Sequence, residues 1–74
     1  ALKLHQGIDF GAPPGAPVYA TADGVISYAA FDSDYGKLVS IDHGYGVVTR
    51  YAHNSELFVV VGQKIKRGDV IAAV

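Results

Sequence analysis

Residues 37–53, KLVSIDHGYGVVTRYAH, predict a β-hairpin. From Lys37 to Asp42, apolar side chains alternate with polar ones, which is the period of a strand that buries one face. The sequence His43-Gly44-Tyr45-Gly46 follows and is rich in residues that form tight turns. In the second half of the hairpin, the same period places four side chains on one face: Val47, Thr49, Tyr51 and His53.

Strand-like segments flank this hairpin on both sides. Residues 24–31 are β-branched and aromatic, and the turn sequence Asp32-Ser33-Asp34-Tyr35-Gly36 follows them. After the hairpin, short strands separated by glycine-containing turns are predicted at residues 57–61, 64–66 and 69–74. A Pro/Gly loop is expected from Gly11 to Pro17. Because no window of eleven residues shows a clean 3.6-residue period, we predict an all-β chain of short strands and hairpins with little or no helix.

The bulk composition limits the possible functions. A chain of 74 residues allows one small domain, and a hydrophobic content of 50% indicates that it folds. The formal charge is -1 and no basic run occurs, so nucleic acid and anionic membranes are poor candidates for partners. The longest apolar run, residues 57–61, is too short to span a bilayer. The absence of cysteine excludes a disulfide framework and a thiolate metal site.

Two potential metal ligands, His5 and Asp9, lie four residues apart near the start of the chain. Imidazole nitrogen and carboxylate oxygen are ordinary zinc donors, with bond lengths of about 2.0–2.2 Å. A straight strand would separate the two residues by about 13 Å, and the neighbouring glycines and prolines disfavour a helix. A bent strand or loop would bring the two side chains together. The spacing alone leaves open the alternative that both are ordinary surface residues.

His53 is the third candidate for a functional site. It ends a predicted strand beside Tyr51, and the turn formers Asn54 and Ser55 follow it. Sites are often built at such positions, although a histidine that only hydrogen-bonds to a loop would suit the same place. The residues leave both interpretations open. His43, in contrast, lies in the predicted hairpin turn and is expected to be structural.

Six sequence blocks occur in order along the chain: HQGIDF at 5–10, GAPV at 15–18, ADGVI at 22–26, IDHG at 41–44, YAH at 51–53 and VGQKIKRGDVIA at 61–72. Together they closely resemble the lysostaphin/LytM-type zinc endopeptidases, which cut peptidoglycan cross-bridges and stem peptides. The resemblance covers nearly all of the chain, and six ordered blocks are far more specific than one spaced pair. It implies a compact antiparallel β-sheet domain, LytM-like and related to the hybrid-motif barrel of biotinyl and lipoyl domains, which agrees with the strands predicted above.

The resemblance also implies roles for individual residues. His5 and Asp9 would be zinc ligands, and His53 would be a catalytic histidine near the scissile bond. The partner would be peptidoglycan peptides, and the location would be periplasmic or extracellular, in the cell envelope.

The family normally completes its site with a His-x-His motif, shortly after the block that is followed here by Ala73 and Val74. That motif supplies the third zinc ligand and a second catalytic histidine. We therefore expect residues 1–74 to be an excised, partial LytM-type metallopeptidase domain that lacks its C-terminal part. As it stands, the chain is expected to be inactive.

Two other functions are weighed against the endopeptidase. A degenerate family member would bind peptidoglycan or activate an amidase without hydrolysis, and such proteins usually lose metal ligands, whereas His5, Asp9 and His53 are all present. A swinging-arm carrier is suggested because residues 61–71 resemble the strand pairs of biotinyl and lipoyl domains. Such a carrier needs a lysine at a hairpin tip, and residues 43–46 contain none. The endopeptidase is therefore the leading hypothesis and the degenerate module its alternative.

Overall fold

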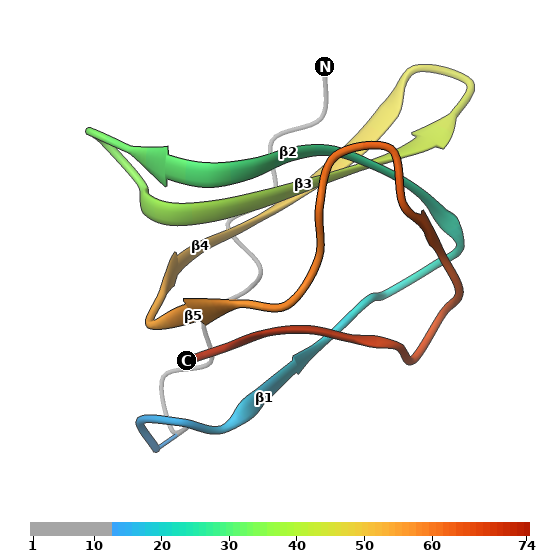
Figure 1. Ribbon diagram of the computed structural model, residues 1–74. Coiled ribbons are helices and arrows are strands. Elements are labelled where there is room, and N and C mark those ends of the chain that lie inside the picture. The colour runs from blue at the N-terminus through green and yellow to red at the C-terminus, as the bar shows by residue number, and fades with distance from the viewer. Residues whose placement is uncertain (1–12) are drawn as a thin grey trace.

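The computed structural model describes residues 13–74, which form strands arranged in two antiparallel sheets (Figure 1). The four-stranded sheet has the order β4-β3-β2-β6, and the three-stranded sheet has the order β1-β7-β5. The strands are β1 Pro17–Tyr19, β2 Gly24–Asp32, β3 Gly36–Gly44, β4 Val47–Asn54, β5 Glu56–Leu57, β6 Lys64–Ile65 and β7 Val70–Ala73. No helix occurs between residues 13 and 74, so none there could cross a membrane. The prediction of an all-β antiparallel domain is confirmed.

Two tight turns join β2, β3 and β4 into a meander. The turn between β3 and β4 contains Tyr45 and Gly46, with φ values of 56° and 77°. Positive φ at both positions is what a two-residue hairpin turn of type I′ requires. At the β2–β3 turn, Asp32 Oδ1 accepts hydrogen bonds from the backbone N–H groups of Asp34 and Tyr35, at 2.8 and 3.1 Å. Both turns lie where the sequence predicts them.

One hydrophobic cluster joins the two sheets. Its members from the four-stranded sheet include Ile26, Val39, Ile41 and Tyr51, and those from the three-stranded sheet include Val18, Ile71 and Ala72. Each of these side chains is buried. Since burial of a large apolar side chain contributes about 1.5–3 kcal/mol, this cluster is the main source of stability that the fold offers.

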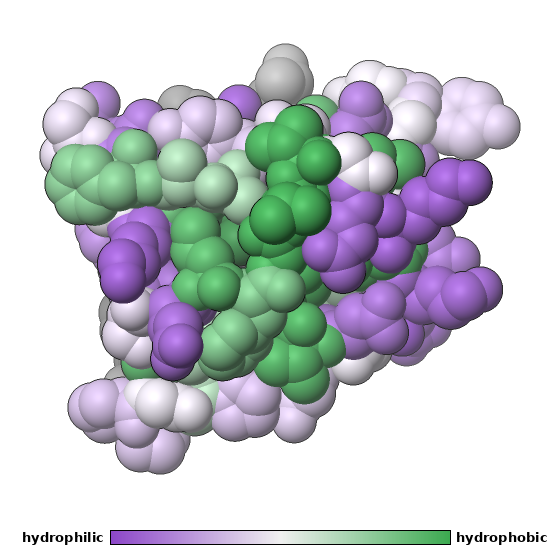
Figure 2. All heavy atoms as spheres, in the orientation of Figure 1, coloured by the Kyte–Doolittle hydropathy of each residue, from purple (hydrophilic) through white to green (hydrophobic). Residues whose placement is uncertain are grey.

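Two segments differ from the predicted strands. Residues 57–61 are predicted as a strand, but only Glu56 and Leu57 pair with β7. After the hydrogen bond from Phe58 N to Ile71 O the chain leaves the sheet, and Val60 and Val61 are exposed. Figure 2 shows a band of hydrophobic side chains on this face of the molecule. β-Branched residues favour a strand only where a partner edge is available.

The second difference lies at the Pro/Gly loop, which is expected to run as far as Pro17. Pro17 instead opens β1, which pairs with β7. Proline is tolerated at the first residue of a strand, where its missing N–H removes no ladder bond.

Candidate functional site

The pairing of β3 with β4 is interrupted near the end of β4. Lys37 pairs with Asn54, and Val39 pairs with Tyr51. Two residues of β4 therefore lie opposite the single residue Leu38 of β3, which defines a β-bulge. Such bulges re-aim a side chain and are frequent beside active sites.

His53 is the residue that this bulge re-aims. Its φ is 60°, in the left-handed region that a residue with a side chain rarely adopts. Thr49 and Tyr51 are buried in the core, whereas His53 is exposed. The prediction that His53 shares their face was wrong, because one inserted residue reverses the alternation of the strand.

Three contacts hold the bulge in place. The backbone N–H of His53 donates to Tyr35 O at 2.8 Å. The buried side chain of Asn54 donates from Nδ2 to Tyr51 O at 2.7 Å and to Lys37 O at 3.0 Å. These bonds satisfy backbone groups that the interrupted ladder leaves without their regular partners. They fix the main chain on both sides of His53.

The ring of His53 has no comparable restraint. Gly36 lies beside it, so that a Cβ at Gly36 would stand 3.8 Å from His53 Nδ1. Within residues 13–74, the ring nitrogens of His53 make no hydrogen bond. They are therefore available to a ligand or a reacting group.

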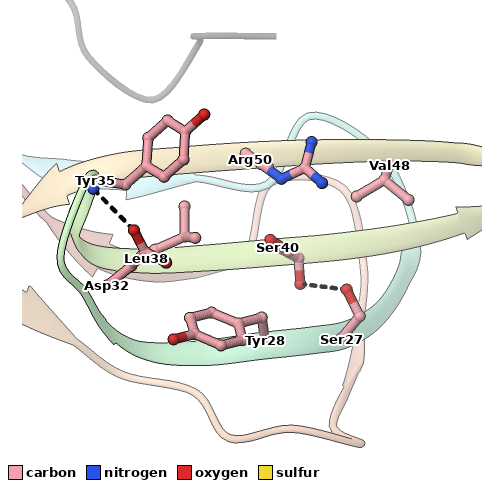
Figure 3. A pocket seen from close by; sticks show the side chains of 8 residues that line it. All are labelled: Ser27, Tyr28, Asp32, Tyr35, Leu38, Ser40, Val48 and Arg50. Atoms are coloured by element: carbon pink, nitrogen blue, oxygen red, sulfur yellow. Dashed lines mark hydrogen bonds between the residues drawn. The ribbon is translucent and has the colours of Figure 1, made fainter. Parts of the chain in front are cut away.

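A groove of about 430 Å³ crosses the four-stranded sheet close to this bulge (Figure 3). Eight residues line it: Ser27, Tyr28, Asp32, Tyr35, Leu38, Ser40, Val48 and Arg50. The neighbouring positions Val39, Thr49 and Tyr51 point into the core, so the groove occupies the opposite face of the sheet. Tyr35 connects the groove to the bulge, since its carbonyl oxygen accepts the hydrogen bond from His53 N.

His43 has a structural role, as expected. Its Nδ1 lies 2.6 Å from Asp23 O, and its Nε2 lies 2.8 Å from Thr49 Oγ1. The Tyr51 hydroxyl continues this chain of hydrogen bonds, 2.9 Å from Thr49 Oγ1 and 2.8 Å from Thr21 Oγ1. Both ring nitrogens are thus engaged in linking β3 to β4 and to the loop before β2.

The candidate metal ligands His5 and Asp9 lie outside the described residues. From residue 13 to residue 74, no group of three or more histidine or acidic side chains could hold a metal ion. The donor set of His5 and Asp9, an imidazole and a carboxylate, fits zinc by its chemistry.

Two residues of this region, Asn54 and Arg50, were not predicted from the sequence to be functional. The sequence indicates only that Asn54 forms a turn, because the pattern of one strand does not show that the side-chain amide bonds across a bulge. Arg50 could have been found, because the alternation that buries Thr49 and Tyr51 turns the residue between them to the other face.

The comparisons with known proteins place this chain in a family. The model of peptidase family M23 matches residues 3–74. The chain belongs to this family. It is 46% identical over 72 residues to the DD-carboxypeptidase/endopeptidase Mpg of Neisseria meningitidis serogroup B, a match that covers 97% of this chain and 16% of that protein. It is 43% identical over 67 residues to the peptidoglycan DD-endopeptidase ShyA of Vibrio cholerae serotype O1, covering 90% of this chain and 16% of that protein.

A solved structure agrees with the family assignment. The crystal structure of a putative peptidase M23 from Pseudomonas aeruginosa superimposes with a TM-score of 0.84 at 36% sequence identity. That match covers 93% of this chain and 30% of the other. The predicted resemblance to LytM-type peptidases is confirmed, and the chain spans about a sixth of the length of the two relatives above.

Proposed function

We propose that this chain contributes to a zinc-dependent endopeptidase that hydrolyses peptide bonds in peptidoglycan cross-bridges or stem peptides. The observation that carries the proposal is the exposed, unpaired ring of His53, presented by a β-bulge beside a groove in an M23 peptidase fold. The names of the relatives, which include peptidoglycan DD-endopeptidases, support the substrate class. By the same argument the protein would act in the cell envelope, in the periplasm or outside the cell.

His5 and Asp9 would hold the zinc ion. A zinc ion with an open coordination position supplies a bound water of lowered pKa and polarises a carbonyl group. The 74 residues contain no His-x-His sequence. We propose that they are part of the metallopeptidase domain, with the third ligand and a second catalytic histidine contributed by such a motif elsewhere in the complete protein.

His53 would be the catalytic residue of this chain. An imidazole can accept a proton from the attacking water and give it to the leaving amine, or donate a hydrogen bond to the developing oxyanion. The bulge fixes the backbone from which the ring projects, so the ring is positioned before the substrate arrives. The adjoining groove offers a surface on which an extended peptide can lie next to His53.

The assignment of the ligands is tested by metal binding as well as by activity. In a complete protein that carries a His-x-His motif, His5→Ala and Asp9→Ala should each lower the affinity for zinc and abolish cleavage of purified peptidoglycan. The 74-residue chain alone should bind zinc with only micromolar or poorer affinity, on the order of the weak binding expected for an incomplete site.

Competitive zinc titration with a chromogenic chelator measures both effects. Unchanged zinc affinity in the His5→Ala and Asp9→Ala variants would contradict the ligand assignment. A complete protein that binds peptidoglycan but never cleaves it would instead support the degenerate, amidase-activating module.

A further inference from the structure

The groove on the four-stranded sheet contains a cation that none of the described residues neutralises. Arg50 is half-buried and its guanidinium lies over the groove between Tyr35 and Val48 (Figure 3). Within residues 13–74, Arg50 takes part in no side-chain hydrogen bond or ion pair. Because a partly buried charge without a partner is unfavourable, an anion that enters the groove gains free energy at this position.

Asp32, the other charged residue of the lining, is not placed to be that partner. Its carboxylate accepts two backbone hydrogen bonds within the β2–β3 turn. Asp32 pairs with Gly36, and Arg50 pairs with Ser40, four residues further along β3. At the rise of a strand, this separates the two positions by about 13 Å along the sheet. Among residues 13–74, the groove therefore has an acidic end whose carboxylate is hydrogen-bonded and a cationic end whose guanidinium has no partner.

We propose that Arg50 binds a free carboxylate of the peptide substrate, so that the groove selects acidic peptides. The inference rests on the proposed function, since it takes the groove to be where the substrate lies. A guanidinium presents parallel N–H donors that match the two oxygens of a carboxylate, which a lysine ammonium cannot do.

The position of Arg50 also limits where the carboxylate stands in the substrate. Arg50 pairs with Ser40, and the bulge that contains His53 lies opposite Leu38, so the two positions are separated by two residues of β3, or about 7 Å. The recognised carboxylate therefore belongs to a residue within about three positions of the bond held at His53. Leu38 and Val48 give the same groove apolar walls against which the aliphatic part of that residue can lie.

A matched pair of ligands tests this inference on the 74-residue chain. The probe is diacetyl-Lys-D-Ala-D-Ala as the free acid and as its C-terminal amide, titrated while chemical shifts are followed by NMR. The acid should bind about tenfold or more tightly than the amide and shift the resonances of Leu38, Ser40 and Val48. Arg50→Gln should abolish that preference, and Arg50→Lys should retain only part of it.

Arg67→Gln is the control, because it removes the same charge from an exposed turn after β6. It should leave the preference for the acid unchanged. A dispersed NMR spectrum of the Arg50→Gln variant verifies that it is folded. Equal binding of acid and amide by the unaltered chain, no binding of either, or a preference that survives in Arg50→Gln would each overturn the inference.

The outcome separates this inference from the proposed function. If cleavage by the complete protein depends on His53 while Arg50→Gln keeps the preference for the acid, the carboxylate site is wrong and the peptidase stands. If Arg50→Gln abolishes the preference while substitution of His53 leaves cleavage unchanged, the site stands and the catalytic role of His53 is wrong.

Discussion

His43 and His53 lie at opposite ends of the β3–β4 pair and have opposite environments. His43, near the hairpin turn, has hydrogen bonds at both ring nitrogens. His53, at the far end, has an exposed ring without a hydrogen bond to any described residue, and its backbone adopts a φ of 60°. Histidine side chains thus have different roles at the two ends of the pair: His43 links two strands by hydrogen bonds, and His53 is exposed to solvent.

The difference arises in the backbone rather than in the side chain. Pairing is regular from Val48 to Tyr51, and the extra residue in the bulge after Tyr51 then turns the side chain of His53 away from the core. Non-glycine residues with positive φ cost free energy and persist where the surroundings hold them. Asn54 and Tyr35 provide that support here. Strain that is held in this way is typical of a functional position.

The largest expected effect on stability is at the His43 end, with Gly24→Ala. A Cβ at this position would stand 2.5 Å from Ile41 Cγ2 and 2.6 Å from Asp42 O. Because a backbone oxygen cannot move aside cheaply, the substitution should lower the free energy of unfolding by about 3 kcal/mol. Urea denaturation followed by circular dichroism measures this loss.

Gly36→Ala is the matched change at the His53 end. Its Cβ would meet His53 only at 3.7–3.8 Å, an ordinary contact, so the cost comes from its φ of 67° alone. We expect a loss of about 1 kcal/mol. Equal losses for the two glycine variants would contradict the difference in packing between the two ends.

The second prediction concerns the hydrogen bonds of His43. His43→Ala should reduce the free energy of unfolding by about 2 kcal/mol, because it leaves Thr49 Oγ1 and Asp23 O without this partner. Denaturant titration measures the loss. Tyr51→Phe, which removes the hydroxyl at the other end of the network, should also lower the free energy of unfolding. A His43→Ala variant as stable as the original chain would show that the network contributes nothing.

The third prediction concerns Asn54, which is proposed to position His53. Asn54→Leu keeps roughly the size of the side chain, introduces no charge and removes the Nδ2 donor of two hydrogen bonds. We expect a loss of about 1–2 kcal/mol in stability. In the complete metal-loaded protein, kcat should fall about tenfold with little change in KM, because the ring of His53 is less well oriented. A change confined to stability would restrict Asn54 to a structural role.

Much of the fold could be predicted from local patterns, because local chemistry determines it. The alternation from Lys37 to Asp42 and the glycine of the Tyr45-Gly46 turn specify a hairpin without reference to the rest of the chain. The bulge at His53 could not be predicted, because it exists only in the pairing of two strands. The same holds for the hydrogen bond between His43 and Asp23, which are 20 residues apart.

The candidate site could be predicted from the sequence only in part. The ordered blocks identify the family, and the family assignment is confirmed. The roles of His5, Asp9 and His53 remain proposals, and His5 and Asp9 lie outside the described residues. Arg50 and Asn54 gain their significance only when β2, β3 and β4 are assembled, since the groove and the bulge are properties of the sheet.

The most direct test of this account is the rate of peptidoglycan cleavage by His53→Gly in the complete metal-loaded protein. Glycine accepts a φ of 60° without strain, so the variant should remain folded and be as stable as the original protein or more so. We predict that cleavage falls about a hundredfold or more, the effect of removing a general acid–base group. A folded His53→Gly variant that cleaves within a few-fold of the original rate would contradict the claim that the bulge presents a catalytic histidine.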